Sequence, residues 1–480
     1  MGFDPFAQRC VRLVDKRTIG GRVDDDGFLE HARRHSEGSC VALLSGRELD
    51  CSRYSILGWD PFLTMESKGL EVLIRFCGET VRMRGDPIAV LENLFDALKP
   101  DFSRLVPPFS GGAMGYLAYD LKNHIERLPE TARDDLGLPD IYLIWPKHIL
   151  VHDRVEGVLR SLEVRCEGDL DENDSSAPPE NGPGGKGGDV VGALQSNMNR
   201  VEYLAAIAAI RNYIREGDVY QVNFAQRFEL DFKGSPFEFW TSLYANNPAP
   251  FYAFVNAGSH QVVSTSMERF LYADGSYIES RPIKGTRKRG GNAEEDEALR
   301  EELLASSKDD AELSMIVDLL RNDLGRICQP RTVRVDEHKR LEAYKNVHHL
   351  ISIVSGKLRQ DASYGDIIRA TFPGGSITGC PKIRAMEIID ELEPHVRHVY
   401  TGSIGYLGWH ENLDLNIAIR TATIHGGKCR FSVGGGIVYD SNGDEEYKET
   451  LDKGRTFFEV LERFATQRVA RADGLGGEGR

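Results

Sequence analysis

The sequence predicts a mixed fold of β-sheets and α-helices, because stretches with a period of two and stretches with a helical period alternate along it. Several short apolar runs bounded by turn residues predict strands in the N-terminal third, namely 41–46, 52–58, 70–76 and 141–151. Residues 199–217 and 444–464 carry apolar residues at helical spacing. A chain of 480 residues is long enough for two to four domains, or for one large core with a satellite.

Composition and charge narrow the classes of function. Apolar residues make up 41% of the chain and charged residues 28%, which is typical of a globular enzyme. The net charge of −15 argues against a nucleic-acid partner, because such partners are bound mainly through cations. An anionic substrate would need local cations that overcome the overall negative field.

The cysteines and the chain start point to a cytoplasmic protein without a membrane segment. None of the eight cysteines belongs to a C-x-x-C pair, so a zinc site is not expected. Scattered cysteines fit a reducing compartment. The first residues lack the pattern of a secretion signal, and no apolar run reaches about 18 residues.

The composition changes between residues 166 and 198, where an acidic stretch is followed by a run rich in proline and glycine. Such a segment buries too little apolar area to offset its chain entropy, so we predict a disordered linker. We therefore expect an N-terminal region over 1–165, a second domain over 199–466 and a flexible tail over 467–480.

A helix and a strand follow the predicted linker. Asn199 with Glu202 forms a capping-box pattern, and Gly217 predicts the helix end. The strand over 220–228 then alternates apolar residues with the amides Gln221, Asn223 and Gln226. The amide face fits either solvent or the lining of a site, and solvent is the preferred interpretation.

Lys284 lies between Pro282 and Gly285, so it is predicted at a bend of the backbone. A lysine acts as a nucleophile only without its proton, and its ordinary pKa of about 10.4 leaves few neutral amines at pH 7. Burial or a nearby cation would lower this pKa. From these neighbours alone, an exposed lysine in a basic turn is the simpler interpretation.

Two glutamates are candidates for chemistry. Glu268 follows the strand-like residues 261–263 and could act as a general acid if burial raises its pKa, although an ion pair is the simpler reading. Glu312 is expected in the first turn of an amphipathic helix that continues to about residue 327, where the helix dipole favours an anion.

The C-terminal helix carries a third group of charges. Glu446, Glu449 and Lys453 are spaced so that all three project from one face. Carboxylates one turn apart could hold Mg²⁺, with water or substrate oxygens completing its coordination. A solvated face with salt bridges along the helix is the alternative.

Three further stretches could contact an anion. Residues 371–381 form a glycine-rich turn that leads into a helix, with Pro381 expected at its first position. Arg420 falls on the polar side of the strand predicted at 413–420, where it could bind a carboxylate or simply be solvated. The glycines within 433–437 would let a ligand approach a strand backbone.

His348 and His349 are most simply interpreted as structural residues without a role in chemistry.

In order along residues 199–464, these stretches resemble the chorismate-utilising enzymes. The resemblance rests on these segments: 218–223, 268–270, 316–319, 321–323, 372–379, 401–406, 419–421 and 434–436. The family implies an α/β (α+β) fold of β-sheets that enclose helices, with the N-terminal region intertwined with the catalytic domain over 199–466.

Within the family, the segment Pro282-Ile283-Lys284-Gly285-Thr286 resembles component I of aminodeoxychorismate synthase, whereas anthranilate synthase component I usually has alanine at the lysine. This resemblance implies conversion of chorismate and ammonia to 4-amino-4-deoxychorismate, on the route to p-aminobenzoate and folate. The ammonia would come from a separate glutamine amidotransferase subunit. The alternatives are anthranilate synthase component I and a non-catalytic subunit that binds chorismate or tryptophan.

The same resemblance implies roles for individual residues. Lys284 would be the nucleophile, Glu268 the general acid, and His349 the histidine near the leaving hydroxyl. The resemblance implies substrate contacts for Thr378, Gly379, Arg420, Gly435, Gly436 and Lys453. It implies Mg²⁺ ligands at Glu312, Glu446 and Glu449. Ser45 lies where relatives bind tryptophan. Met267 and Cys380 depart from the proline and alanine common in the family.

Overall fold

The computed structural model describes residues 4–19, 21–46, 49–101, 108–167 and 194–474, with the backbone alone at 456 and 462–474. Most of the predicted linker therefore lies outside the described residues, but its two flanks are well packed. Cys166 ends a strand and is buried, and Met198 is buried in front of the first helix of the C-terminal part.

The N-terminal region is mainly strand, as the apolar runs predicted. Its elements are β1 (Arg9–Ile19), α1 (Asp25–Arg34), β2 (Cys40–Leu44), β3 (Tyr54–Lys68), β4 (Glu71–Phe76), β5 (Glu79–Arg84), α2 (Pro87–Ala97), β6 (Leu98–Pro100), β7 (Gly112–Leu117), β8 (Ile141–Asp153) and β9 (Val158–Cys166). Pro146 does not interrupt β8, because it lies opposite Pro61 beside an irregularity in the ladder with β3.

The C-terminal part alternates hairpins with helices. Its strands are β10 (Gln195–Ser196), β11 (Gln221–Asp231), β12 (Phe251–Asn256), β13 (His260–Ser266), β14 (Arg269–Asp274), β15 (Tyr277–Arg281), β16 (Ile283–Lys288), β17 (Arg334–Ala343), β18 (Val347–Lys357), β19 (Gly379–Cys380), β20 (Ser403–Gly408), β21 (Asn412–Asn416), β22 (Thr421–His425) and β23 (Lys428–Ile437). Its helices are α3 (Arg200–Glu216), α4 (Pro236–Asn246), α5 (Ala293–Ala305), α6 (Ser307–Gly325), α7 (Tyr364–Thr371), α8 (Lys382–Leu392) and α9 (Gly443–Gly474).

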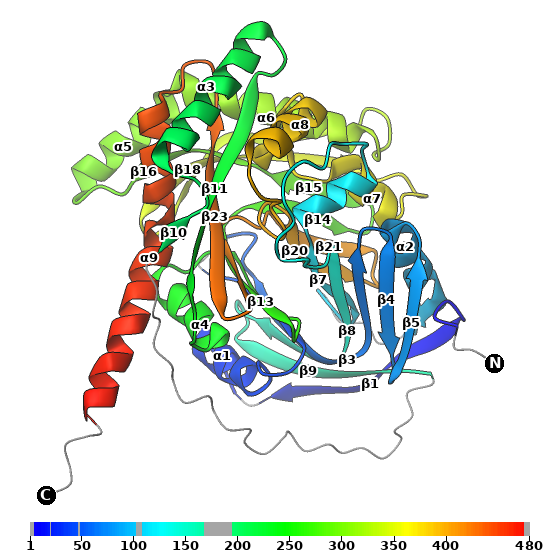
Figure 1. The fold of residues 1–480 in the computed structure, drawn as a ribbon. Coiled ribbons are helices and arrows are strands. Elements are labelled where there is room, and N and C mark those ends of the chain that lie inside the picture. Colours follow the sequence, from blue (N-terminus) through cyan, green and yellow to red (C-terminus); the bar gives the residue numbers. More distant parts are fainter. Residues whose placement is uncertain (1–3, 20, 47–48, 102–107, 168–193, 475–480) are drawn as a thin grey trace, which may run out of the picture.

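Two rows of strands diverge from β3, and both contain strands from the two ends of the chain (Figure 1). One row follows the order β3, β8, β7, β20, β21, β14, β15 and β18, and the other follows β3, β2, β12, β13, β22, β23 and β11. Ala42 of β2 lies opposite Phe254, and Tyr116 of β7 lies opposite Ile404. The predicted α/β fold with an intertwined N-terminal region is therefore confirmed.

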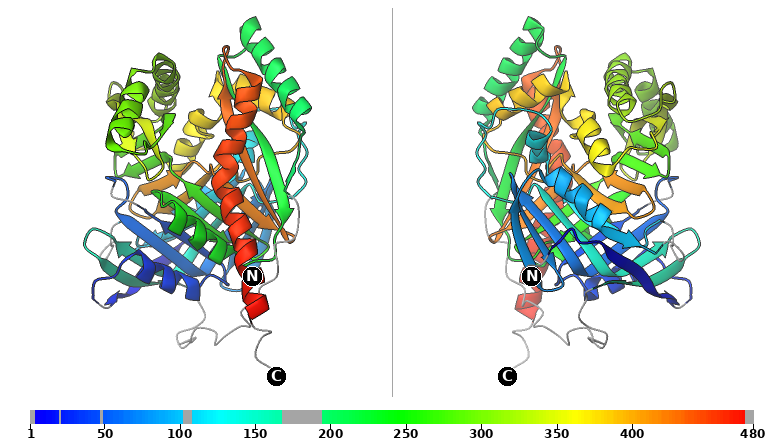
Figure 2. Two further views of the ribbon diagram at one scale, coloured as in Figure 1. Left: turned by 90° about the vertical axis from the view of Figure 1, so that its left-hand side faces the viewer. Right: turned by 90° about the vertical axis from the view of Figure 1, so that its right-hand side faces the viewer.

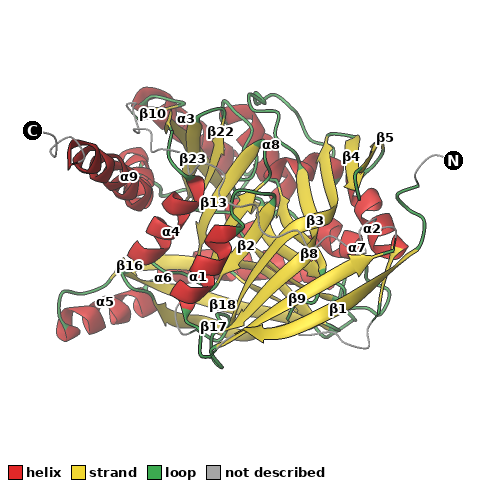
Figure 3. Ribbon diagram, turned by 90° about the horizontal axis from the view of Figure 1, so that it is seen from below, coloured by secondary structure: helices red, strands yellow, loops and turns green. Residues whose placement is uncertain are grey.

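The helices pack against the sheets, and the two regions share their apolar cores (Figures 2 and 3). One large apolar cluster joins Ile74 and Trp145 of the N-terminal strands to Ile316 of α6 and Met386 of α8. Because residues so far apart in sequence share one core, neither part could bury its apolar surface alone. Helix α9 packs against β23 and runs along one side of the molecule.

Local signals set several element ends. The side chain of Asn199 caps α3 together with Glu202, and Gly217 ends that helix in the left-handed region, as predicted. The predicted start of α6 at Glu312 is wrong. Ser306 accepts a hydrogen bond from the Asp309 amide, so the helix begins at Ser307 and places Glu312 in its second turn, away from the terminal amides.

Two further expectations shift slightly at element ends. Pro381 is the residue before α8 rather than its first residue, and Ala385 donates to its carbonyl. Helix α9 continues to Gly474, into the stretch predicted as a tail, and residues 475–480 are outside the described residues.

Candidate active site

The two rows of strands meet α6 and α9 around a cavity of about 670 Å³. Most of the predicted site residues line it, although they are spread over almost two hundred positions. They are Glu268, Lys284, Glu312, His349, Arg420, Gly435, Gly436, Glu446, Glu449 and Lys453. The fold therefore brings the candidate nucleophile, acid, cations and carboxylates to one place.

Lys284 enters this cavity from a bend, as predicted. It is the second residue of β16, where the ladder with β18 is irregular between Lys284 and Thr286. Gly285 has a φ of +75°, a conformation that most side chains disfavour. Burial lowers the pKa of Lys284 although the charges of Glu312 and Glu268 oppose this, and the ammonium of Lys453 lowers it further. The lowered pKa favours the neutral amine that a nucleophile requires.

Glu268 lies in the short connection between β13 and β14, and it is buried. Burial raises the pKa of Glu268 to about 7, although the Ser376 hydroxyl, the Lys284 ammonium and the Ile283 amide favour its charged form. The backbone amide of Glu268 donates to the Ser266 hydroxyl at 3.2 Å, which fixes this connection despite Met267 before it. A carboxyl that titrates near neutral pH is suited to act as a proton donor.

His349 and His348 are adjacent on β18 and point to opposite sides. His348 contacts Asp296 at 2.9 Å, whereas His349 lines the cavity. Nδ1 of His349 lies 3.0 Å from the Thr286 hydroxyl, and its Nε2 has no hydrogen-bond partner among the described residues. Burial lowers the pKa of His349 to about 3, so the imidazole is neutral.

Two cations suit the carboxylates of an anionic ligand. Arg420 has a φ of +49° just before β22, and its guanidinium forms no ion pair within the part of the chain that the structure describes. Burial lowers its pKa, so an anion in the cavity would recover favourable interactions with it. Lys453 pairs with Glu449 at 2.6 Å and donates to the Gly434 carbonyl at 3.0 Å.

The carboxylates of Glu446 and Glu449 flank the glycines of β23. A Cβ atom on Gly435 would lie 3.2 Å from Oε2 of Glu446 and 3.8 Å from Oε1 of Glu449. Burial raises the pKa of Glu446 and the nearby charge of Glu449 adds to this rise, whereas the Ser441 hydroxyl opposes it. This cradle provides the oxygen ligands that Mg²⁺ prefers, with room for water or substrate oxygens.

The three predicted metal ligands line one cavity without forming a complete cage. Within the described ranges, no group of three or more His, Cys, Asp or Glu side chains is close enough to hold a metal ion. Glu312 thus faces the cavity from α6 while Glu446 and Glu449 face it from α9. Mg²⁺ usually keeps several waters and uses few protein carboxylates, so this arrangement fits it.

Two predicted substrate contacts, Thr378 and Gly379, do not line the main cavity but lie behind the residues that do. Thr378 is fully buried and its hydroxyl donates to the Gly374 carbonyl at 3.0 Å. Gly379 pairs with β11, where a Cβ would lie 2.1 Å from the Gln221 carbonyl. Ser376 and Ile377 line the cavity in their place, because the short helical turn at 375–377 faces inward.

The preferred interpretation of the amide face of β11 as solvent-exposed is wrong. Gln221 is buried, and Asn223 lines the cavity beside the glycines of β23. Sequence reasoning also missed Lys308 and Tyr400, which line the same cavity. Tyr400 directly precedes a segment that carried the resemblance, but nothing in its own neighbours distinguishes it from a core aromatic residue.

Comparison with known proteins agrees with this geometry. The sequence profile described as chorismate binding enzyme matches residues 43–459, which is most of the chain. The chain belongs to the chorismate binding enzyme family.

Relatives of two kinds resemble this chorismate-binding enzyme. Aminodeoxychorismate synthase component 1 of Escherichia coli strain K12 is 39% identical over 86% of this chain and 90% of its own length. Anthranilate synthase component 1 of Acetivibrio thermocellus is 34% identical over 90% of this chain and 92% of its own length. The crystal structure of anthranilate synthase component I from Streptococcus pneumoniae TIGR4 matches with a TM-score of 0.73 and 30% identity, over 85% of this chain and 92% of that one.

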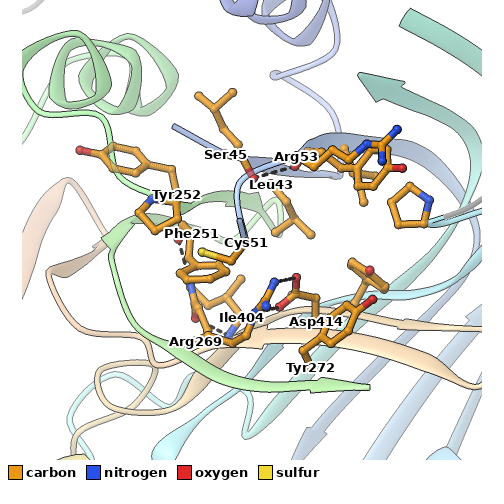
Figure 4. A pocket seen from close by; sticks show the side chains of 18 of the residues that line it. Leu43, Ser45, Cys51, Arg53, Phe251, Tyr252, Arg269, Tyr272, Ile404 and Asp414 are labelled. Carbon is orange, nitrogen blue, oxygen red and sulfur yellow. Dashed lines mark hydrogen bonds and ion pairs between the residues drawn. The ribbon is translucent and has the colours of Figure 1, made fainter. Parts of the chain in front are cut away.

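The chorismate-binding enzyme has a second pocket of about 310 Å³, where Ser45 lies (Figure 4). Ser45 donates from its hydroxyl to the Tyr54 carbonyl at 2.7 Å. On the other side, Arg269 forms a two-point contact with Asp414 at 3.0 and 2.8 Å and lies below the Phe251 ring (Figure 4). Since Arg269 directly follows Glu268, one short segment contributes to both pockets.

Further ion pairs extend from this second pocket toward the cavity. Arg281 bonds Glu279 at 2.7 Å and Asp50 at 2.8 Å, and Arg340 bonds the same Asp50 at 3.0 Å. Arg340 also pairs with the buried Glu342 at 3.0 Å. The hydroxyl of Tyr344 donates to Glu342, and its ring packs edge-on against His349. The two pockets are therefore joined by continuous contacts.

The arrangement in the main cavity can combine three kinds of chemistry. A buried amine beside a carboxyl that titrates near pH 7 allows nucleophilic attack with proton transfer. The cations and the acidic cradle allow the binding of a dianion with a divalent metal.

No helix in the described ranges is long and apolar enough to cross a membrane.

Proposed function

We propose that this chorismate-binding enzyme is an aminodeoxychorismate synthase component I, which converts chorismate and ammonia to 4-amino-4-deoxychorismate for p-aminobenzoate and folate synthesis. The observation that carries the proposal is the position of Lys284, a half-buried lysine that lines the cavity and has a lowered pKa, with the neutral-range carboxyl of Glu268 nearby. Relatives named aminodeoxychorismate synthase component 1 support it, and they match this chain over most of its length.

In the first half of the proposed reaction, the lone pair of Lys284 Nζ forms a bond to C2 of chorismate. Both conjugated ring double bonds shift, C1=C2 to C1=C6 and C5=C6 to C4=C5, and the C4–O bond breaks. Glu268 gives its proton to the departing oxygen, which leaves as water. The neutral His349 lines the same cavity, and its unpaired Nε2 would hydrogen-bond the hydroxyl before it leaves.

In the second half, ammonia forms a bond to C4 and the C2–Nζ bond breaks, which restores the neutral Lys284 amine. The new C4 ammonium returns one proton to the Glu268 carboxylate. Arg420, Lys453 and the backbone at Gly435 and Gly436, which lines the cavity, would hold the substrate carboxylates during both steps.

Glu446 and Glu449 would hold Mg²⁺, with Glu312 facing them across the cavity. The bound metal would neutralise carboxylate charge on the substrate. The ammonia would come from a glutamine amidotransferase subunit, a proposal supported by the designation of the relatives as component 1. A cytoplasmic location is proposed because the eight cysteines are scattered along the chain without a C-x-x-C pair, which fits a reducing compartment.

The product identifies the reaction. With chorismate, an ammonium salt and Mg²⁺, we expect the isolated chain to form a non-fluorescent product that a separate lyase converts to p-aminobenzoate. Anthranilate synthase component I is the second candidate, since relatives of that name match nearly as well. Fluorescent anthranilate appearing without any lyase would select it, and turnover by the isolated chain would exclude a non-catalytic subunit.

Removal of the metal tests the acidic cradle. Dialysis against EDTA is expected to abolish turnover, and Mg²⁺ should restore it. Glu449→Gln should raise the Mg²⁺ concentration for half-maximal activity by about tenfold or more, because a neutral amide is a weaker ligand. Calorimetric titration with Mg²⁺ in the presence of chorismate gives a readout independent of turnover, and an unchanged Mg²⁺ affinity in the variant would contradict the assignment.

We further propose that the second pocket binds tryptophan. Its lining balances Asp50, Glu279 and Asp414 against Arg53, Arg269 and Arg281, and it includes Phe251 and Tyr272, which suits a zwitterion with an aromatic group. Tryptophan should raise the midpoint of thermal unfolding by several degrees at saturation. Ser45→Trp, which fills the pocket, should remove this shift, and a shift that persists in the variant would place the ligand elsewhere.

A further inference from the structure

Asn223 lines the main cavity, and its side-chain oxygen has no hydrogen-bond partner among the described residues. It lies on β11 opposite Gly436 of β23, so both residues face the same side of the ladder. Its Nδ2 donates to the Ser376 carbonyl at 3.5 Å. This contact orients the amide and identifies Oδ1 as its acceptor atom. Oδ1 is shielded from solvent and has no hydrogen-bond partner among the described residues. Buried acceptors in native proteins are normally paired, so an unpaired one at a site suggests a missing ligand.

The surroundings of Gly436 place Asn223 close to the reacting amine. A Cβ atom on Gly436 would lie 3.5 Å from Nζ of Lys284 and 1.9 Å from Nε2 of Gln221. Gln221 precedes Asn223 by two residues on the same face, and its Oε1 is also without a partner in the described part of the chain. The side chains of Gln221 and Asn223 thus lie on the face of β11 that adjoins Gly436 and the Lys284 amine.

A neutral acceptor selects a particular donor. Carboxylates stabilise ammonium, whose nitrogen lone pair is occupied by a proton and cannot attack carbon. An amide oxygen accepts a hydrogen bond from neutral ammonia without stabilising the extra proton to the same degree. The chorismate carboxylates are acceptors only and cannot pair with Oδ1. The C4 hydroxyl of chorismate could donate, but the proposed first half of the reaction removes it as water, so in the second half the small neutral donor that this acceptor fits is ammonia.

We propose that Asn223 binds the attacking ammonia through Oδ1, an inference that rests on the proposed function. One N–H of ammonia donates to Oδ1 while its lone pair faces C4 of the substrate. As the C4–N bond forms, the C2–Nζ bond to Lys284 breaks and its electrons return to Nζ. The surplus proton on the new C4 ammonium passes to Glu268, which the Ser376 hydroxyl contacts.

The test separates the two half-reactions. Asn223→Leu removes the acceptor at similar size, and Asn223→Asp replaces it with a carboxylate. Chorismate is mixed with each variant and Mg²⁺, first without ammonia and then with ammonium chloride at fixed pH. We expect the mass of the covalent adduct on Lys284 to appear at the wild-type rate in both variants. The Michaelis constant for ammonia should rise about tenfold or more in Asn223→Leu, with that for chorismate unchanged.

Asn223→Asp should turn over more slowly still near neutral pH, because its carboxylate would favour ammonium. Asn256→Leu is the matched control, since Asn256 is buried too but its amide is paired with backbone groups at Ser36, Glu37 and Gly258, away from the cavity. This control should lower the unfolding midpoint and leave the ammonia dependence unchanged. Adduct formation also reports that each variant is folded.

The possible failures are distinguishable. If the wild type forms no adduct, the proposed role of Lys284 fails. If the adduct forms normally and both Asn223 variants keep the wild-type Michaelis constant for ammonia, the inference about Asn223 is overturned. An equal loss of adduct formation and ammonia turnover in both variants would also overturn it, because Asn223 would then act on chorismate rather than on ammonia.

Discussion

Replacing Lys284 by alanine is expected to lower the turnover of chorismate with ammonia by about 10³-fold or more, because the covalent route needs the amine. The cavity holds other cations, so the dianionic substrate should still bind. The Michaelis constant for chorismate should therefore change far less than the turnover number. Intact-mass spectra taken after mixing with chorismate and Mg²⁺ should show an adduct on the wild type and none on the variant.

Lys288→Ala is the matched control for this experiment. Lys288 lies on the same strand, but its side chain is 76% exposed and makes only a 4.0 Å contact with Glu295. Its removal should leave turnover, adduct formation and stability essentially unchanged. An adduct of the same mass on Lys284→Ala would assign the nucleophile to another residue.

Much of the fold could be predicted because local signals agreed with the final packing. The capping box at Asn199, the left-handed Gly217 and the period of α9 are properties of neighbouring residues. What the sequence could not show is the order of the two rows of strands, since Ala42 and Phe254 pair across two hundred residues. Such pairing depends on the whole core rather than on any local pattern.

The candidate site could likewise be predicted only in part, because local signals indicated the residues but not their environment. Lys284, Glu268 and Arg420 each had a simpler interpretation as exposed or ion-paired residues, and only their shared cavity makes chemistry the better explanation. The amides of β11 were assigned to solvent because alternation identifies two faces but not which face is buried. The start of α6 was missed because Ser306 lies before a polar run that obscures the helical period.

Glu268→Gln is expected to lower turnover by about 10²–10⁴-fold, because the amide cannot protonate the leaving hydroxyl. The pH profile of the wild type provides a sharper test. The pKa of Glu268 is raised to about 7, so the acid is protonated below this pH and its contribution is lost as the pH rises through about 7. The activity that remains in Glu268→Gln should lack this falling limb. A variant that retains it would assign the limb to another group.

The same pKa predicts a gain in stability for this inactive variant. The carboxyl has a pKa near 4.5 when unfolded and about 7 when folded, so the folded protein binds the proton more tightly. The cost of ionising the buried group is therefore absent below pH 4.5 and complete above pH 7. At about 1.4 kcal/mol per pH unit, it reaches about 3 kcal/mol. Glu268→Gln stays neutral, so at pH 8 its free energy of unfolding should exceed that of the wild type by up to about 3 kcal/mol, with a smaller difference at pH 5. Denaturant titrations at the two pH values measure this, and an equal difference at both would show that Glu268 is not a buried acid.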